Sequence, residues 1–166
     1  MIHLIGVNHA IQHNGFKRRI NKDKADEIRD EFKNYILKTI KEEKISYVAE
    51  ESNPEVLKLL EATSTMAELA AKALKIPYKY VEPETKTRIA LEIPAENYEH
   101  FSDNEKEKIY RIREKYWFEQ IQDVIGSNIL FICGPAHIDS FAELLQQKQW
   151  QVSILVDYWG KKYVPT

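Results

Sequence analysis

The sequence lacks features that several large protein classes need. Its single cysteine, Cys133, excludes an intrachain disulfide framework and any cysteine cluster for zinc or iron–sulfur. The formal net charge of −2 and the pI of about 6.2 do not indicate nucleic acid or an anionic membrane as a partner. No apolar run has the length of a membrane span, and no signal-peptide pattern opens the chain, so we expect a cytoplasmic protein.

Several common catalytic motifs are absent as well. The chain has no P-loop, no Gly-x-Gly-x-x-Gly fingerprint, no Gly-x-Ser-x-Gly elbow and no His-Glu-x-x-His helix. The chemistries that depend on these motifs therefore find no support in the sequence.

The hydrophobic pattern predicts an α/β fold. The 166 residues, of which 43% are hydrophobic, are enough for one domain with a buried core. Short apolar runs alternate with helical periodicity, which indicates a single domain over residues 1–166, with helices flanking a central, mostly parallel sheet of about five strands. The predicted strands are Ile2–Val7, Ile45–Ala49, Tyr78–Val81, Ile129–Cys133 and Val152–Val156.

Tetrapeptides with the spacing of a capping box mark where helices begin. These are Ser52-Asn-Pro-Glu55, Thr65-Met-Ala-Glu68 and Ser102-Asp-Asn-Glu105. The stretch from Pro83 to His100 is the least regular, and we expect a loop there that covers the site. The predicted helices are Lys22–Glu43, one from Pro54, Thr65–Leu74, one from Ser102 to Val124, and Ile138–Gln147.

Two Gly-x-x-His tetrapeptides, Gly6-Val-Asn-His9 and Gly134-Pro-Ala-His137, each follow an apolar, strand-like run. The frequencies of glycine and histidine in the chain predict roughly 0.15 such motifs by chance, and there are two. Two strands that end in the same way can lie side by side in a parallel sheet and present both histidines at one edge. The pair therefore marks a candidate site at the carboxyl ends of these strands.

Carboxylates follow two further predicted strands, Glu50 and Glu51 after one and Glu82 after another. Successive residues of a strand face opposite sides of the sheet, so only one of Glu50 and Glu51 faces the site unless both lie beyond the strand end. His9, His137 and Glu51 would form a two-histidine, one-carboxylate set for a divalent metal that activates water. The alternative is that the histidines only satisfy local backbone groups.

Arg113 lies with Trp117 on the apolar face of the predicted helix that follows Ser102. An arginine on an apolar face needs a carboxylate or an anionic ligand, which leaves two roles open. Arg113 either forms a buried ion pair with Glu50 or Glu51, or it binds a substrate carboxylate or stabilises an oxyanion.

In this order of motifs the chain resembles the Tiki/TraB/ChaN-like superfamily, which includes relatives of erythromycin esterase. Its members resemble one another in a first Gly-x-x-His, an acidic residue after the next core strand, an arginine-bearing helix and a second Gly-x-x-His. The matching positions here are His9, Val48-Ala-Glu-Glu51, Arg113-Glu-Lys-Tyr-Trp117 and His137.

The chain is also similar to a compact bacterial branch of such proteins. In that branch a helix containing Ser-Thr leads to a strand that ends in an acidic-Pro pair, with an arginine a few residues later. Ser64-Thr65, Glu82-Pro83 and Arg88 match that description. The resemblance implies a ChaN-like α/β fold, and it implies activities that range over metal-dependent proteolysis, ester hydrolysis without an obligatory metal, and haem or iron binding.

The leading prediction is a hydrolase that acts on a small-molecule or peptide substrate, either through a divalent metal or through histidines as acid and base. The residues expected to carry the chemistry are His9, Glu50, Glu51, Arg113 and His137. The residues expected to contact the substrate are Glu82, Arg88 and Trp117, and the two arginines would bind an anionic group. The alternatives are a non-catalytic module for iron, haem or another small anionic ligand, and a defence or regulatory domain that acts through a partner protein.

Overall fold

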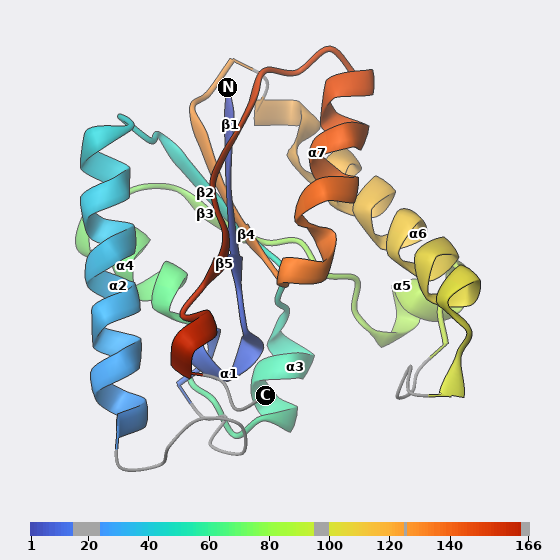
Figure 1. Ribbon diagram of the computed structural model, residues 1–166, viewed down its shortest axis with the longest axis horizontal. Coiled ribbons are helices and arrows are strands. Elements are labelled where there is room, and N and C mark those ends of the chain that lie inside the picture. The colour runs from blue at the N-terminus through green and yellow to red at the C-terminus, as the bar shows by residue number, and fades with distance from the viewer. Residues whose placement is uncertain (15–23, 95–99, 125, 164–166) are drawn as a thin grey trace.

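A parallel sheet forms the centre of the structure, a computed structural model that describes residues 1–14, 24–94, 100–124 and 126–163 (Figure 1). The five strands within these ranges all run in the same direction, in the order β3-β2-β4-β1-β5. The predicted α/β fold with its parallel sheet is therefore confirmed. The strands are β1 (Ile2–Val7), β2 (Tyr47–Glu50), β3 (Tyr78–Tyr80), β4 (Ile129–Cys133) and β5 (Val152–Trp159).

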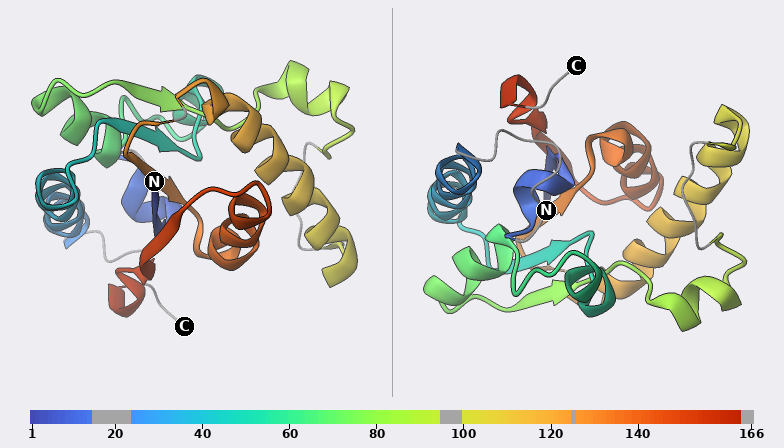
Figure 2. Two further views of the ribbon diagram at one scale, coloured as in Figure 1. Left: turned by 90° about the horizontal axis from the view of Figure 1, so that it is seen from above. Right: turned by 90° about the horizontal axis from the view of Figure 1, so that it is seen from below.

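Helices cover both faces of this sheet (Figure 2). α1, α2 and α4 pack on one face, and α6 and α7 pack on the other. The α-helices of the described ranges are α1 (His9–Gln12), α2 (Ala25–Glu42), α3 (Pro54–Leu59), α4 (Met66–Ala73), α5 (Thr85–Ala90), α6 (Asp103–Ile121) and α7 (Ile138–Gln147). Successive residues of β4 point to opposite faces of the sheet. Leu130 packs with α2 and α4, whereas Phe131 packs with Trp117 of α6 and Phe141 of α7. Among the helices of the described ranges, none is both long and apolar enough to cross a membrane.

The two strands that carry the Gly-x-x-His motifs, β1 and β4, are neighbours in the sheet, as predicted. Their register pairs Gly6 with Cys133, so the two motifs leave the sheet within one residue of each other. On the other side of β4, Glu50 of β2 pairs with Ile132. The carboxyl ends of three adjacent strands thus bring both motifs and the glutamate pair to one edge.

The chain leaves β1 and β4 toward opposite faces of the sheet. The segment after β1 leads to α2 on one face, whereas the segment after β4 leads to α7 on the other face (Figure 1). Open parallel sheets bind ligands at the carboxyl edge where neighbouring connections diverge in this way. The fold therefore places the two motifs where a parallel sheet most often carries its site.

Short polar side chains set the starts of several helices. Thr65 caps α4 and Ser102 caps α6 with a complete capping box, as their spacing predicts. At α3 the cap is Asn53 and not Ser52, because the hydroxyl of Ser52 bonds instead to the ring of His13. The predicted start of α3 is right, but the capping residue is one position later.

The boundary between α2 and β2 also differs from the prediction. The N–H of Ile45 donates to the carbonyl of Ile40 (2.9 Å), so Ile45 closes the end of α2 and β2 begins only at Tyr47. At its other end α2 is described from Ala25, and the predicted start at Lys22 lies outside the described residues.

Two further segments are more regular than expected. Part of the stretch from Pro83 to His100 forms α5, while residues 95–99 lie outside the described part of the chain. β5 continues beyond Val156 to Trp159, because Trp159 packs on Phe32 of α2, with ring centroids 4.7 Å apart. The predicted fourth helix ends as α6 at Ile121 and continues as a short 3₁₀ turn to Val124.

Candidate functional site

Glu51 is the residue on which the predicted site converges. It directly follows β2, and its side chain is buried. The N–H of Gly134 donates to its Oε2 (2.7 Å), and Nη2 of Arg113 donates to its Oε1. The Nε2 atoms of His9 and His137 lie 3.7 and 3.8 Å from the same Oε1. Both Gly-x-x-His motifs therefore meet at one carboxylate.

Opposing effects act on the pKa of Glu51. Burial alone would raise it, because removal from water disfavours the charged form. Against this, the charge of Arg113, then the neighbouring His137 and His9, and the N–H of Gly134 hold the pKa of Glu51 well below its usual range. Glu51 is thus a buried carboxylate that stays ionised at neutral pH.

Arg113 of α6 lies between two carboxylates. Its Nε and Nη2 donate to Glu82 at 2.9 to 3.2 Å, and Nη2 also donates to Glu51. Its Nη1 donates to Nε2 of His137 (3.2 Å), and its guanidinium carbon lies 5.2 Å from the ring centre of Trp117. Of the two predicted roles, these contacts are those of a buried ion pair, with Glu82 as a second partner that the sequence did not indicate.

Glu82, Arg88 and Trp117, the residues predicted to contact a substrate, form a hydrogen-bonded cluster in which Glu82 also binds Arg113. Nη1 of Arg88 donates to Oε1 of Glu82 (2.8 Å), and Nε1 of Trp117 donates to Oε2 (3.0 Å). Trp117 is fully buried against Phe131 and holds Glu82 in place. Arg88 and Arg113 together balance the charge of Glu82.

His137 is buried between α6 and α7. Its ring packs edge-on against Tyr110 and Trp117, with centroids 4.4 and 4.8 Å away. Because Arg113 has only N–H donors, Nε2 of His137 accepts from it, and Nδ1 carries the proton donated to Glu114 (2.9 Å). Both ring nitrogens of His137 are therefore hydrogen-bonded.

His9 is the open member of the pair. Asn8 caps α1 by accepting the N–H of Ala10 (2.9 Å), which makes His9 the first residue of that helix. The side chain of His9 is 47% exposed, whereas those of Glu51 and His137 are each 4% exposed. A molecule in solution can therefore reach the site through His9.

Glu50, one residue before Glu51, points to the opposite face of the sheet. Its carboxylate accepts hydrogen bonds from Nε2 of Gln12 (2.9 Å) and from the hydroxyls of Thr65 and Tyr78. Burial raises the pKa of Glu50 to about 7, and these three donors limit the rise. The expected alternation holds, and of the two predicted carboxylates Glu51 is the one that faces the histidines.

The predicted metal set can be compared with these contacts. A metal held by His9, His137 and Glu51 needs a free lone pair on a ring nitrogen of each histidine. In His137 the lone pair of Nε2 accepts from Arg113, whose charge would also repel a cation there, and Nδ1 is bound to Glu114. Within the described ranges no three His, Cys, Asp or Glu side chains are arranged to hold a metal ion. In this arrangement a metal ion on Nε2 of His137 would have to displace Arg113.

Sequence reasoning did not pair Gln12 and Glu114 with the histidines that they hold. Gln12 lies three residues after His9, and its Oε1 is 2.7 Å from Nδ1 of His9. That spacing is a signal, but α1 has only four residues, too few for periodicity to detect a helix. Glu114, the partner of His137, sits to the side of the apolar stripe of α6, and its burial comes from the packing of α7.

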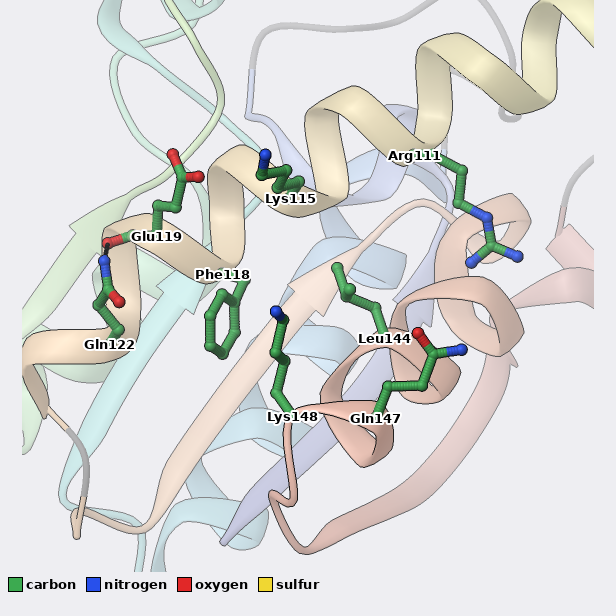
Figure 3. Close-up of a pocket in the computed structure, with 8 residues that line it drawn as sticks. All are labelled: Arg111, Lys115, Phe118, Glu119, Gln122, Leu144, Gln147 and Lys148. Atoms are coloured by element: carbon green, nitrogen blue, oxygen red, sulfur yellow. Dashed lines mark hydrogen bonds between the residues drawn. The ribbon is translucent and has the colours of Figure 1, made fainter.

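A groove of about 670 Å³ lies between α6 and α7 (Figure 3). Figure 3 shows Lys148 beside Phe118, with Nζ 5.9 Å from the ring centre. The groove is lined by Arg111, Lys115, Phe118, Glu119, Gln122, Leu144, Gln147 and Lys148. None of the residues predicted for the site lines it, so concavity alone does not locate the polar site of this protein.

No protein-family model, curated protein or solved structure matches this chain. The resemblance to the Tiki/TraB/ChaN-like superfamily therefore stays a prediction from short motifs. Because such motifs bear on fold more than on reaction, the function has to be argued from the geometry of the site.

Proposed function

We propose that this chain is a metal-independent hydrolase of the Tiki/TraB/ChaN-like type, with His9 as its general base. The observation that supports this function is the facing pair of His9 Nε2 and Glu51 Oε1, 3.7 Å apart, in which His9 is open to solvent and Glu51 is buried. An exposed imidazole beside an ionised carboxylate is well suited to take a proton from water near neutral pH.

The reaction begins when Nε2 of His9 accepts a proton from a water molecule whose oxygen attacks the acyl carbon of an ester. The imidazolium that forms lies beside the carboxylate of Glu51, whose negative charge stabilises it. The same Nε2–H then donates its proton to the departing alkoxide oxygen, which returns His9 to its neutral form. Both proton transfers therefore use one nitrogen.

Arg113 and His137 act on Glu51 and not on the substrate. Arg113 keeps Glu51 ionised and oriented, and His137, bound at both nitrogens, holds Arg113 from the other side. The negative charge of Glu51 disfavours an anionic group next to His9. The proposed substrate class is therefore a neutral ester and not a phosphate ester.

Hydrolysis of p-nitrophenyl acetate by the purified protein tests this function. We expect turnover that dialysis against EDTA does not change, and a His9→Ala variant with kcat/KM lower by about 10²–10⁴-fold. His100→Ala is the matched control, because His100 is an exposed histidine outside the site and its loss should leave the rate unchanged. p-Nitrophenyl phosphate should be a poor substrate.

Three results would argue against the proposal. A wild-type rate in His9→Ala would exclude His9 as the base. Loss of activity in EDTA with recovery in zinc would support the metal-dependent alternative. Tight, stoichiometric binding of haem or iron without ester hydrolysis would support the non-catalytic binding module.

A further inference from the structure

We propose that Gln12 is a positioning residue that holds the neutral ring of His9 in the Nδ1–H tautomer, so that Nε2 is the basic nitrogen. The catalytic meaning of this inference rests on the proposed function, but the tautomer can be measured whether or not the chain is a hydrolase. Gln12 is the last residue of α1 and is fully buried. Its side-chain amide connects the histidine to both glutamates of the β2 end.

Two acceptors fix the orientation of the Gln12 amide. One end of the amide lies 3.1 Å from the backbone carbonyl oxygen of Glu51 and 2.9 Å from Oε2 of Glu50. A backbone carbonyl can only accept a hydrogen bond, so this end must be the NH₂ group. The other end of the amide is therefore its oxygen, which also can only accept.

The oxygen of Gln12 in turn determines where the proton of His9 lies. Oε1 is 2.7 Å from Nδ1 of His9, and a hydrogen bond between them requires the hydrogen to be on Nδ1. A neutral imidazole carries one N–H, so the lone pair is on Nε2. This is the nitrogen that lies 3.7 Å from Glu51 on the open side of the site.

A second histidine holds the backbone of His9. Nδ1 of His13 donates to the carbonyl oxygen of His9 (3.0 Å), and Nε2 of His13 accepts from the hydroxyl of Ser52 (3.0 Å). Burial lowers the pKa of His13 to about 4, so His13 is neutral at physiological pH and places no charge beside His9. Gln12 thus orients the ring of a residue whose main chain is already fixed.

Long-range proton–nitrogen NMR spectra of the histidine side chains test the inference. The wild type should show the Nδ1–H tautomer for His9. Gln12→Met removes both ends of the amide at similar size, and it should move the tautomer ratio about tenfold toward Nε2–H and lower kcat by no more than that factor. Gln12→Glu keeps an acceptor for Nδ1–H, and with a proton on the oxygen that faces the carbonyl of Glu51 it also keeps a donor there, so it should show the wild-type tautomer. Glu50→Gln is the matched control, because it changes the other partner of Gln12 and leaves the contact with His9.

The possible results separate this inference from the proposed function. An Nε2–H tautomer in the wild type would overturn it, and so would a Gln12→Met variant that loses thermal stability but keeps the His9 tautomer. An Nδ1–H tautomer in a protein that hydrolyses no ester would support the inference and overturn the proposed function. If Gln12→Met does not fold, the spectra of the wild type and Gln12→Glu still decide the question.

Discussion

The two Gly-x-x-His motifs leave the sheet at neighbouring strands, yet they hold their histidines in different surroundings. In the first motif Asn8 caps a short helix, and His9 stays largely exposed. In the second motif Pro135 begins a 3₁₀ turn that places His137 between α6 and α7, with both nitrogens bound. Equal spacing therefore does not mean equal roles, because the residues inside the motif and the helices that pack on it decide how exposed each histidine is.

The two glycines differ in the same way. A Cβ atom on Gly6 would lie 1.9 Å from the backbone carbonyl oxygen of Asp157 in β5. A Cβ atom on Gly134 would lie 3.4 Å from both Oε2 of Glu51 and Nε2 of His9, which is an ordinary contact distance. The first glycine is thus required by the packing of the sheet, whereas the second leaves space within the site.

The largest expected effect comes from removing the cation that supports the second motif. Arg113→Met leaves Glu51 and Glu82 buried without their main partner, and we expect the free energy of unfolding to fall by about 3–5 kcal/mol. Arg111→Met is the control on the same helix, and because Arg111 is partly exposed its loss should cost no more than about 1 kcal/mol. Urea denaturation measures both, and equal losses would contradict a special role for Arg113.

The next largest effect is expected from the two glycines, whose substitution by alanine should lower stability by different amounts. Gly6→Ala should lower the free energy of unfolding by about 3 kcal/mol, because the clash is with backbone that cannot move aside easily. Gly134→Ala should cost less than about 1 kcal/mol in stability but should lower ester hydrolysis, because the methyl group narrows the space between His9 and Glu51. Thermal unfolding and rates on the same preparations test this, and a Gly6→Ala variant of wild-type stability would contradict it.

Two buried titratable groups near the first motif, Glu50 and His13, should act oppositely on stability. Burial raises the pKa of Glu50 from 4.5 to about 7, so the folded chain keeps a proton that the unfolded chain loses, and stability falls as the pH rises through this range. Burial lowers the pKa of His13 from 6.5 to about 4, so the unfolded chain gains a proton first, and stability falls as the pH drops through this range. Each effect amounts to about 3 kcal/mol, so the two should nearly cancel in the wild type.

Single substitutions should reveal each of these opposing effects. Glu50→Gln leaves the effect of His13, and its stability should increase by about 2 kcal/mol as the pH rises from 4.5 to 7. His13→Gln leaves the effect of Glu50, and its stability should decrease over the same range. Urea denaturation at several pH values measures both slopes. Variants whose pH dependence runs parallel to that of the wild type would show that these groups do not have the shifted pKa values.

The smallest expected difference in the free energy of unfolding is between alanine variants of the two histidines. His137→Ala removes one buried hydrogen bond from Glu114 and one from Arg113, which should cost about 1–3 kcal/mol of stability. His9→Ala removes an exposed ring and should change stability by no more than about 0.5 kcal/mol while it abolishes most hydrolysis. Chemical denaturation and rate measurements together compare them, and a greater loss of stability in His9→Ala would reverse the roles assigned to the two motifs.

Much of this site could be predicted because parallel strands end at a common edge. That rule brought His9, Glu51 and His137 together from three distant segments, and strand alternation required that Glu50 and Glu51 separate. Which of the two glutamates faces the histidines could not be predicted, because it depends on the face against which α6 packs. The partner of Arg113 was open for the same reason, since Glu82 reaches it only through the packing of α6 against the strand ends.

The position of β1 has a consequence for how the chain is assembled during synthesis. β1 is synthesised before β2 and β3, whereas its two neighbours in the sheet, β4 and β5, are synthesised after them. A nascent chain that ends before Ile129 therefore carries the apolar strand Ile2–Val7 with both edges unpaired, and we expect it to need protection from aggregation. Because β4 must insert between β1 and β2, Glu51 acquires the N–H of Gly134 only at that step. The candidate site is therefore complete only once β4 is in place, and chains truncated before Ile129 should be inactive as well as unstable.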